Sequence, residues 1–209
     1  MLFKTPHIRR QALILLKASV MANLALGLFA PIYAVFVQQI GGGILDIGIA
    51  LALFYVVTGL FVIFFGTSKF FAKHVRTMVV IGYALLTLGF IGYIFIKIPI
   101  HLFIVQIVLG IADGILEPSW DSVYSAKLSE KQESKQWSIW AGSIHIVLGV
   151  AAIAGGLIVT HGSFKILFVI MAVLGAISAV IASQLLKNYP KQDWNTKSLI
   201  VKRIGRQKT

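Results

Sequence analysis

The chain has 209 residues, of which 58% are hydrophobic and 12% charged, and it carries a formal net charge of +12. This composition argues against an ordinary soluble domain and indicates a membrane protein. The chain has no cysteine, which excludes disulfide and thiol chemistry. Lys and Arg collect at the ends of apolar segments, so attraction to anionic membrane lipid explains the positive charge better than nucleic-acid binding does.

Six apolar segments follow one another along the chain. They cover residues 12–37, 44–66, 77–97, 101–123, 137–160 and 164–187. Each is long enough to cross a hydrocarbon core of about 30 Å as a helix, and lipid leaves no other partner for the backbone. The first segment is too long for the apolar core of a signal peptide. We predict an all-α membrane protein, with a six-helix bundle over residues 1–188 and a basic cytoplasmic tail over residues 189–209.

The positive charges lie almost entirely on one side of this alternation. Only Lys97 and Lys165, of 19 Lys and Arg residues, fall in loops on the other side. Cytoplasmic loops carry an excess of Lys and Arg. The pattern therefore predicts that both termini are cytoplasmic and that the protein crosses the inner or plasma membrane six times.

The first two segments carry local signals for where their helices bend and begin. Pro31 predicts a kink near the end of the first segment because proline removes a helical hydrogen bond. Asn23, near the middle of that segment, is interpreted as a hydrogen-bonding contact between helices rather than a substrate ligand. Asp46 follows the glycines at 41–43 and is predicted to cap the second helix.

Polar residues are distributed unequally among the segments. The third and sixth are almost wholly apolar, whereas the first, fourth and fifth carry amide, acidic and imidazole groups. Polar groups at membrane depth face a bundle interior or a watery cavity. The sequence thus predicts that segments 1, 4 and 5 line such a space and that segments 3 and 6 face lipid. This pattern suggests a three-plus-three internal repeat, a hallmark of transporters.

The fourth segment carries the most reactive pattern. At 100° per residue, one arc of about 80° holds a polar stripe, bordered by Trp120. Its members are Gln106, Gly110, Asp113, Glu117, Asp121 and Tyr124. An acid at bilayer depth costs at least ~2.5 kcal/mol unless water, a proton or a cation compensates it. Our hypothesis is that Asp113, aided by Glu117, binds a cation or proton; the alternative is a structural hydrogen bond to the first helix or to a partner bundle. Asp121 is interpreted as solvated.

The fifth segment carries His145, two tryptophans and several glycines. His145 pairs with Glu117 or relays protons in one interpretation; in the favoured one it is a neutral histidine hydrogen-bonded between helices. Trp137 and Trp140 are assigned to the interfacial aromatic belt. The glycines predict a surface for close helix packing, formed by Gly149, Gly155 and Gly156.

The run from Gly66 to Arg76 holds a glycine and several cations, Gln106 stands four residues before Gly110, and residues 151–156 end in two glycines. Together with the six-span layout, these motifs resemble one six-helix half of a major facilitator superfamily transporter, over residues 10–188. The family's Gly-x-Leu-Ala-Asp-Arg-x-Gly-Arg-Arg loop is similar to the run from Gly66 to Arg76, with Phe70 at the acidic position. The family's Arg-x-x-x-Gly is similar to Gln106-x-x-x-Gly110. Its Gly-Pro-x-x-Gly-Gly is similar to the run at 151–156. The family comparison implies a gating role for Gly66, Lys69, Lys73 and Arg76, although membrane topology alone explains these cations.

The resemblance implies a small-molecule or ion substrate bound at mid-membrane between two six-helix bundles. The first and fourth helices would line the cavity, and a second bundle would be needed, with a homodimer favoured. The candidate substrate- or proton-binding residues are Asp113, Glu117, Gln106, Asn23, His145 and Trp120. The resemblance gives no reason to expect a cofactor or a metal. Neither a metal-ligand motif such as His-Glu-x-x-His nor a phosphate-binding loop occurs, so an enzyme is not expected.

Two other functions fit the sequence. One is a six-helix substrate-capture subunit of an importer driven by separate ATPases, which a copurifying ATPase would favour. The other is a membrane scaffold that transports nothing, which is favoured if replacing Asp113 and Glu117 leaves function intact.

Overall fold

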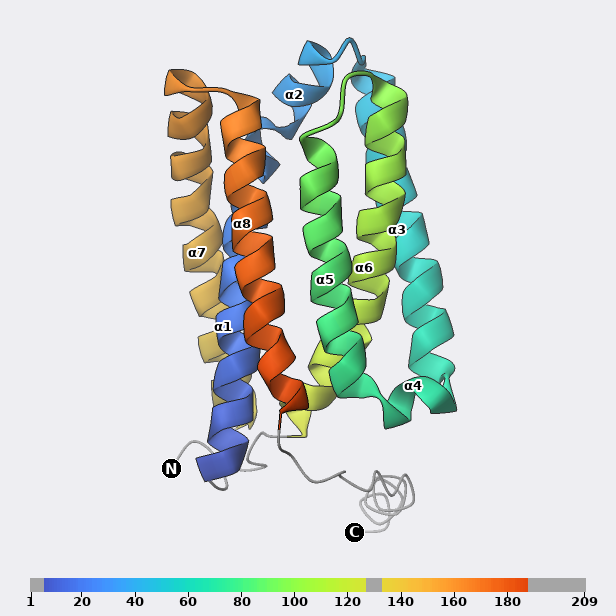
Figure 1. Cartoon of the computed structure of the whole chain (residues 1–209), viewed down its shortest axis with the longest axis vertical. Coiled ribbons are helices and arrows are strands. Elements are labelled where there is room, and N and C mark those ends of the chain that lie inside the picture. The colour runs from blue at the N-terminus through green and yellow to red at the C-terminus, as the bar shows by residue number, and fades with distance from the viewer. Residues whose placement is uncertain (1–5, 127–132, 188–209) are drawn as a thin grey trace.

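The computed structural model of the chain describes residues 6–126 and 133–187, and the regular elements in these ranges are all helices (Figure 1). The loop cations Lys127 and Lys131 and the predicted basic tail lie outside the described residues. The α-helices are α1 (Pro6–Phe29), α2 (Tyr33–Gln39), α3 (Ile44–Thr67), α4 (Lys69–Lys73), α5 (Val75–Tyr93), α6 (Pro99–Ser125), α7 (Glu133–His161) and α8 (Phe164–Ser183). Two 3-10 turns, η1 (Ala30–Ile32) and η2 (Gln184–Leu186), extend α1 and α8.

Six helical units in the described ranges are long and apolar enough to cross a membrane. They are Arg10–Gln39, Ile44–Thr67, Val75–Tyr93, Pro99–Ser125, Glu133–His161 and Phe164–Leu186. The third unit ends at Tyr93, earlier than its apolar segment suggests, because the chain tightens there: the N–H of Ile94 donates to Ile91 O, three residues back, at 3.1 Å. The prediction of an all-α protein with six membrane-spanning helices is confirmed.

Proline and glycine shape the first helical unit and the start of the second. The unit breaks at η1, which contains Pro31, and resumes as α2, so the predicted kink is present. Gly41, with φ +83°, then turns the chain. Asp46 was expected at the N-cap of α3, but it does not occupy that position. Gly43 does, and Asp46 lies three residues further on, where its Oδ2 accepts a hydrogen bond from the Gly43 N–H at 2.7 Å.

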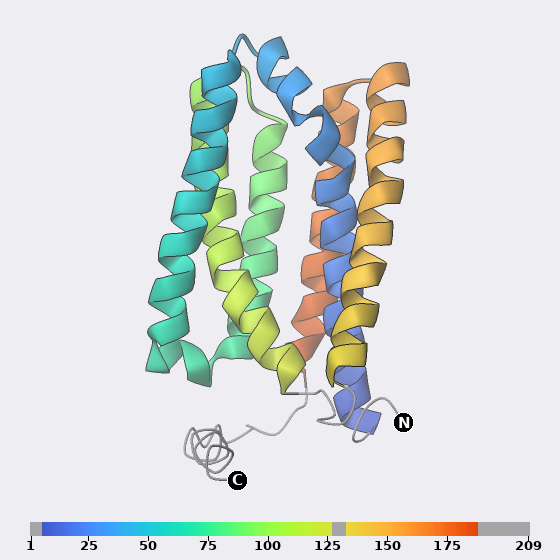
Figure 2. The same cartoon turned by 180° about the vertical axis from the view of Figure 1, so that it is seen from behind.

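The helices form two layers. One holds α5 and α8, and the other holds α1, α3, α6 and α7 (Figures 1 and 2). In the second layer α6 packs on α3 and α5, just as α1 packs on α7 and α8, while α5 and α8 pack on each other. The first three spans and the last three thus make equivalent contacts, which confirms the three-plus-three repeat. The outer faces of α5 and α8 are apolar and exposed, with Leu88 56% and Val180 66% exposed, as lipid-facing surfaces should be.

The two ends of the bundle differ in charge. The start of α1, helix α4, the end of α6 and the start of α7 lie together at the lower end in Figure 1. The described cations at this end are Arg10, Lys17, Lys69, Lys73, Arg76, Lys135 and Lys187, whereas Lys97 and Lys165 lie at the opposite end. We call the first the cationic end. Its assignment to the cytoplasm stays a prediction from the charge rule.

Aromatic side chains join the helices at both ends. Away from the cationic end, Phe29 of α1 contacts Tyr93 of α5 and Phe168 of α8, with ring centroids 4.9 and 5.1 Å apart. At the cationic end, rings of α6 and α7 form a second group, which we call the tryptophan cluster. It consists of Trp120, Tyr124, Trp137 and Trp140. Trp137 and Trp140 were assigned to the aromatic belt, but they pack inward because the end of α6 meets the start of α7.

Glycines allow the closest helix contacts. A Cβ on Gly155 of α7 would lie 1.8 Å from the carbonyl oxygen of Leu28, so α1 and α7 touch backbone to backbone. At the equivalent contact between the repeats, a Cβ on Gly110 of α6 would lie 2.8 Å from the carbonyl oxygen of Phe54 in α3. Of the predicted packing glycines, Gly155 is therefore buried in the bundle, whereas Cβ atoms on Gly149 and Gly156 would meet nothing within 4 Å.

Gly155→Ala should destabilise the bundle because the added methyl group forces α1 and α7 apart. Overpacking of this kind costs about 1–3 kcal/mol. Gly156→Ala, at the next residue, is the matched control and should leave the unfolding temperature in detergent unchanged. Equal unfolding temperatures for the two variants would contradict the contact between α1 and α7.

Candidate functional site

The polar stripe of α6 lies between two lines of helix contact. On one side Gly110 and Gly114 pack against α3, and on the other Leu109 and Leu116 pack against Gly89 and Gly82 of α5. Asp113 and Glu117 project between these lines, about 20° to either side of the direction of Gln106. Towards the cationic end α6 leans across to α1 (Figure 2). The stripe thus faces the side of the bundle on which α1 lies.

A hydrogen bond between side chains joins the first and fourth spans across this space. Nε2 of Gln106, a residue only 4% exposed, donates a hydrogen bond to the Tyr33 hydroxyl at 2.7 Å. Tyr33 is the first residue of α2, so the break at Pro31 positions its ring. Sequence reasoning missed Tyr33. The available signal was the proline two residues earlier, but the direction of the chain after a 3-10 turn cannot be read from helical spacing.

Asp113 and Glu117, two of the three acids of the stripe, have no hydrogen-bond partner in the described residues. Asp113 is half-buried and Glu117 is exposed. Among residues 6–126 and 133–187, neither carboxylate has a hydrogen bond or ion pair, and Thr58 of α3 donates instead to the Gly110 carbonyl at 3.3 Å. In the same ranges no group of three His, Cys, Asp or Glu could hold a metal ion. The acids are thus available to a proton, a cation or a polar solute.

Asn23 and His145 make their recorded contacts inside their own helices. The Asn23 amide donates to the Ser19 carbonyl oxygen at 2.8 Å and to its hydroxyl at 3.2 Å, both within α1. Nδ1 of His145 lies 2.7 Å from the carbonyl oxygen of Ala141, one turn back in α7. These contacts give no support to the interpretation of either side chain as a link between helices. His145 is exposed and lies about 100° around α7 from the buried Ile144.

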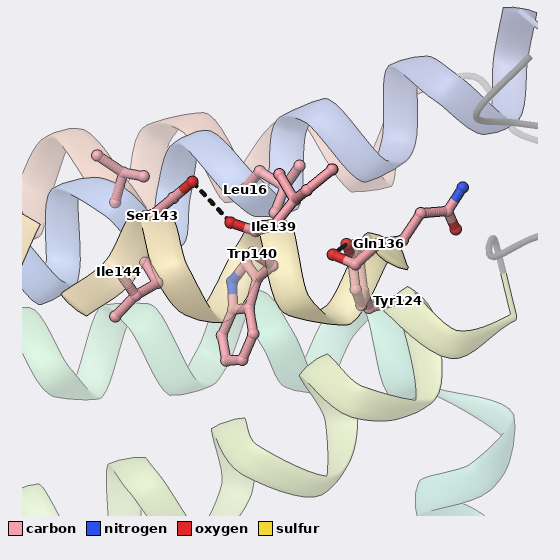
Figure 3. A pocket seen from close by; sticks show the side chains of 8 residues that line it. Leu16, Tyr124, Gln136, Ile139, Trp140, Ser143 and Ile144 are labelled. Carbon is pink, nitrogen blue, oxygen red and sulfur yellow. Dashed lines mark hydrogen bonds between the residues drawn. The ribbon is translucent and has the colours of Figure 1, made fainter. Parts of the chain in front are cut away.

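Trp120 lies far from Gln106 along α6. It lies fourteen residues further along α6, which is about 21 Å at 1.5 Å per residue. Its ring packs 4.8 Å from that of Trp140, and the Tyr124 hydroxyl beside it donates to the Gln136 carbonyl at 3.3 Å (Figure 3). Trp120 therefore helps to close the cationic end between α6 and α7, while Gln106 and Tyr33 lie towards the other end.

The candidate gating loop is a short helical connection. Gly66 lies in the last turn of α3, Lys69 and Lys73 begin and end α4, and Arg76 is half-buried in the first turn of α5. The Ser68 hydroxyl accepts the Phe71 N–H at 3.4 Å and so caps α4. Phe70 is 65% exposed.

Comparison with known proteins places the chain among membrane transporters. The family model for the Major Facilitator Superfamily matches residues 15–206. The uridine/deoxyuridine transporter of Lactococcus lactis subsp. cremoris is 30% identical to this chain over 159 residues. The match covers 68% of this chain and 33% of the relative, so the chain spans about a third of that protein's length.

Proposed function

This chain belongs to the Major Facilitator Superfamily, and we propose that it moves a small solute across the membrane by alternating access, together with a second six-helix bundle. The observation that carries the proposal is the pair of acids on α6 without partners in the described residues. An acid at the centre of a membrane helix costs about 2.5–3.5 kcal/mol, and such residues usually mark an ion or substrate path.

The exposed faces of α3 and α7 support the need for a second bundle. These two helices occupy equivalent places in the repeats, and each is packed on a single main neighbour. On α7, Gly142, Gly149 and Gly156 recur every seven residues and so share one face, and a Cβ on any of them would meet nothing within 4 Å. Gly59 and Gly66 of α3 are equally open. Small residues mark helix–helix interfaces in membranes because they let backbones approach closely.

The second bundle is either another copy of this chain or a further part of a longer transporter. A single bundle forms only one side of a cavity along the α6 stripe, so a second bundle must supply the opposite side. Docking along α3 and α7 would enclose the face that carries Gln106, Asp113 and Glu117. The match covers only 33% of the relative, which is compatible with either source.

The groups near the stripe suit a neutral or cationic polar solute. Tyr33 and Gln106 offer hydroxyl and amide groups, and α6 contains no Lys or Arg to attract an anion. Because the Lactococcus lactis relative is named as a uridine/deoxyuridine transporter, uridine is the first solute to test. Coupling to protons through Asp113 is part of the proposal.

The other candidate functions now have less support. A capture subunit would depend on a separate ATPase, which the facilitator family does not require. A scaffold would not need acids without partners on the face of α6. The two following tests separate the transporter from both.

Asp113→Asn should abolish uphill accumulation of solute in proteoliposomes with an imposed proton gradient, because the amide cannot carry the proton. Uridine uptake is measured with and without the gradient. Asp121→Asn is the matched control because Asp121 is an exposed acid on the same helix near its end. Proton-driven uptake by Asp113→Asn equal to that of the wild type would remove Asp113 from the mechanism.

Gly149→Leu with Gly156→Leu should weaken association with the second bundle, because the new side chains hold the backbones apart. The oligomeric mass of the purified chain in detergent is the measurement. Ala84→Leu with Ala176→Leu places the same leucine side chains at exposed positions of α5 and α8 and should leave the mass unchanged. A monomer that transports as well as the assembled protein would refute the requirement for a second bundle.

A further inference from the structure

A small apolar pocket lies between α1 and α7 at the cationic end, separate from the free acids of α6. Its volume is about 240 Å³. The lining residues are Leu16, Val20, Tyr124, Gln136, Ile139, Trp140, Ser143 and Ile144 (Figure 3). Tyr124, Gln136 and Ile144 are buried and form the floor, whereas Ile139, 52% exposed, and Ser143 lie at the mouth. The pocket therefore opens on the surface of a membrane-spanning helix.

The pocket's size and lining restrict what it can hold. Binding sites for whole small molecules measure about 300–1,000 Å³, so this one accepts only part of a larger molecule. Its side chains are mostly aliphatic or aromatic, and the Tyr124 and Ser143 hydroxyls already donate to backbone carbonyls. The part that enters is thus apolar. Ile139 and Ser143, at the mouth, lie about 80° and 120° around α7 from Gly149, so a second bundle docked on the glycine face leaves the Ser143 side of the mouth open to lipid.

Cations flank the pocket on both helices: Lys135 of α7 lies one turn closer to the cationic end than Ile139, and Lys17 of α1 is adjacent to the lining residue Leu16. Lys135, Ile139 and Ser143 are spaced by four residues and so lie within an arc of about 80° on α7. On α1, Lys17 is exposed, lies next to Leu16 in the sequence and precedes Val20 by one turn, with Arg10 two turns further back. The one acid in the first turn of α7, Glu133, points about 160° away from Lys135.

We propose that this pocket binds an anionic phospholipid, with part of an acyl chain between α1 and α7 and the phosphate beside Lys17 and Lys135. The depth of the site agrees with this occupant: Lys135 lies at the end of its span, where headgroups begin, and the long side chain of Lys17, inside the first span, can extend back towards them. Lys and Arg near a membrane surface attract anionic headgroups. The pocket adds a fixed place for the chain, so the binding is selective and not merely a general attraction of the charged end.

Quenching of tryptophan fluorescence by brominated lipid tests the site directly, since Trp140 lines the pocket. The full chain with Trp194→Phe, which leaves only the three tryptophans of the tryptophan cluster, is reconstituted in mixed phosphatidylglycerol and phosphatidylcholine vesicles. Bromine is placed on the acyl chains of one lipid or the other at equal mole fraction. Brominated phosphatidylglycerol should quench several times more than its mole fraction predicts, and brominated phosphatidylcholine less.

Substitutions distinguish lipid binding in the pocket from general attraction of lipid by the cationic end. Lys17→Gln with Lys135→Gln should remove the preference for phosphatidylglycerol, whereas Lys73→Gln with Arg76→Gln, which removes the same charge elsewhere at this end, should keep it. Ser143→Phe, at an exposed position, fills the mouth and should reduce quenching by either lipid. Equal quenching by the two lipids, or equal loss in both double variants, would overturn the proposal. Competition by inorganic phosphate alone would also overturn it, because the site would then hold a free anion and not a lipid.

Discussion

Lipid offers no hydrogen-bond partner, and this constraint decides where each polar side chain of the bundle lies. Most hydroxyl groups within the spans donate to a carbonyl of their own helix, as Thr87 does to Tyr83 and Ser119 to Ile115. Such hydroxyl groups need no hydrogen-bond partner in a neighbouring helix. Among the described residues α6 carries several exceptions: Gln106 reaches across to Tyr33, and Asp113 and Glu117 have no partner. Others lie on neighbouring helices, since Thr58 of α3 donates to Gly110 of α6 and the buried Nε1 of Trp140 in α7 has no partner. The exceptions on α6 are the ones to which we assign transport.

The two repeats use one packing design twice. Backbone contact through Gly155 joins α7 to α1, and backbone contact through Gly110 joins α3 to α6. The apolar layer of α5 and α8 supports both pairs from the lipid side. This leaves α1 and α6 as the two central helices of the opposite layer and α3 and α7 as its edges. The residues proposed for solute and for assembly therefore occupy the same layer, whereas the proposed lipid pocket lies between α1 and the outer helix α7.

Sequence alone predicted the number of spans, their order and the repeat. Each span can be recognised from its own apolar length and flanking charges, without knowledge of its neighbours. It also selected the α6 stripe, since helical spacing fixes which residues share a face. It failed where two helices must meet. Tyr33 depends on the turn after Pro31, Trp137 and Trp140 turn inward because the end of α6 lies beside them, and Asn23 bonds within α1. None of these contacts leaves a periodic trace in one sequence.

Single cysteines placed along α6 give the most direct test that its stripe lines a watery path, because the chain has no cysteine of its own. The measurement is labelling by a charged thiol reagent in membranes, which reacts with the thiolate and so requires water at the site. Asp113→Cys and Glu117→Cys should be labelled, whereas Ile104→Cys and Ile111→Cys, on the opposite face, should stay unlabelled. Equal labelling of both faces, or labelling of the isoleucine positions alone, would contradict the assignment of α6 to the transport path.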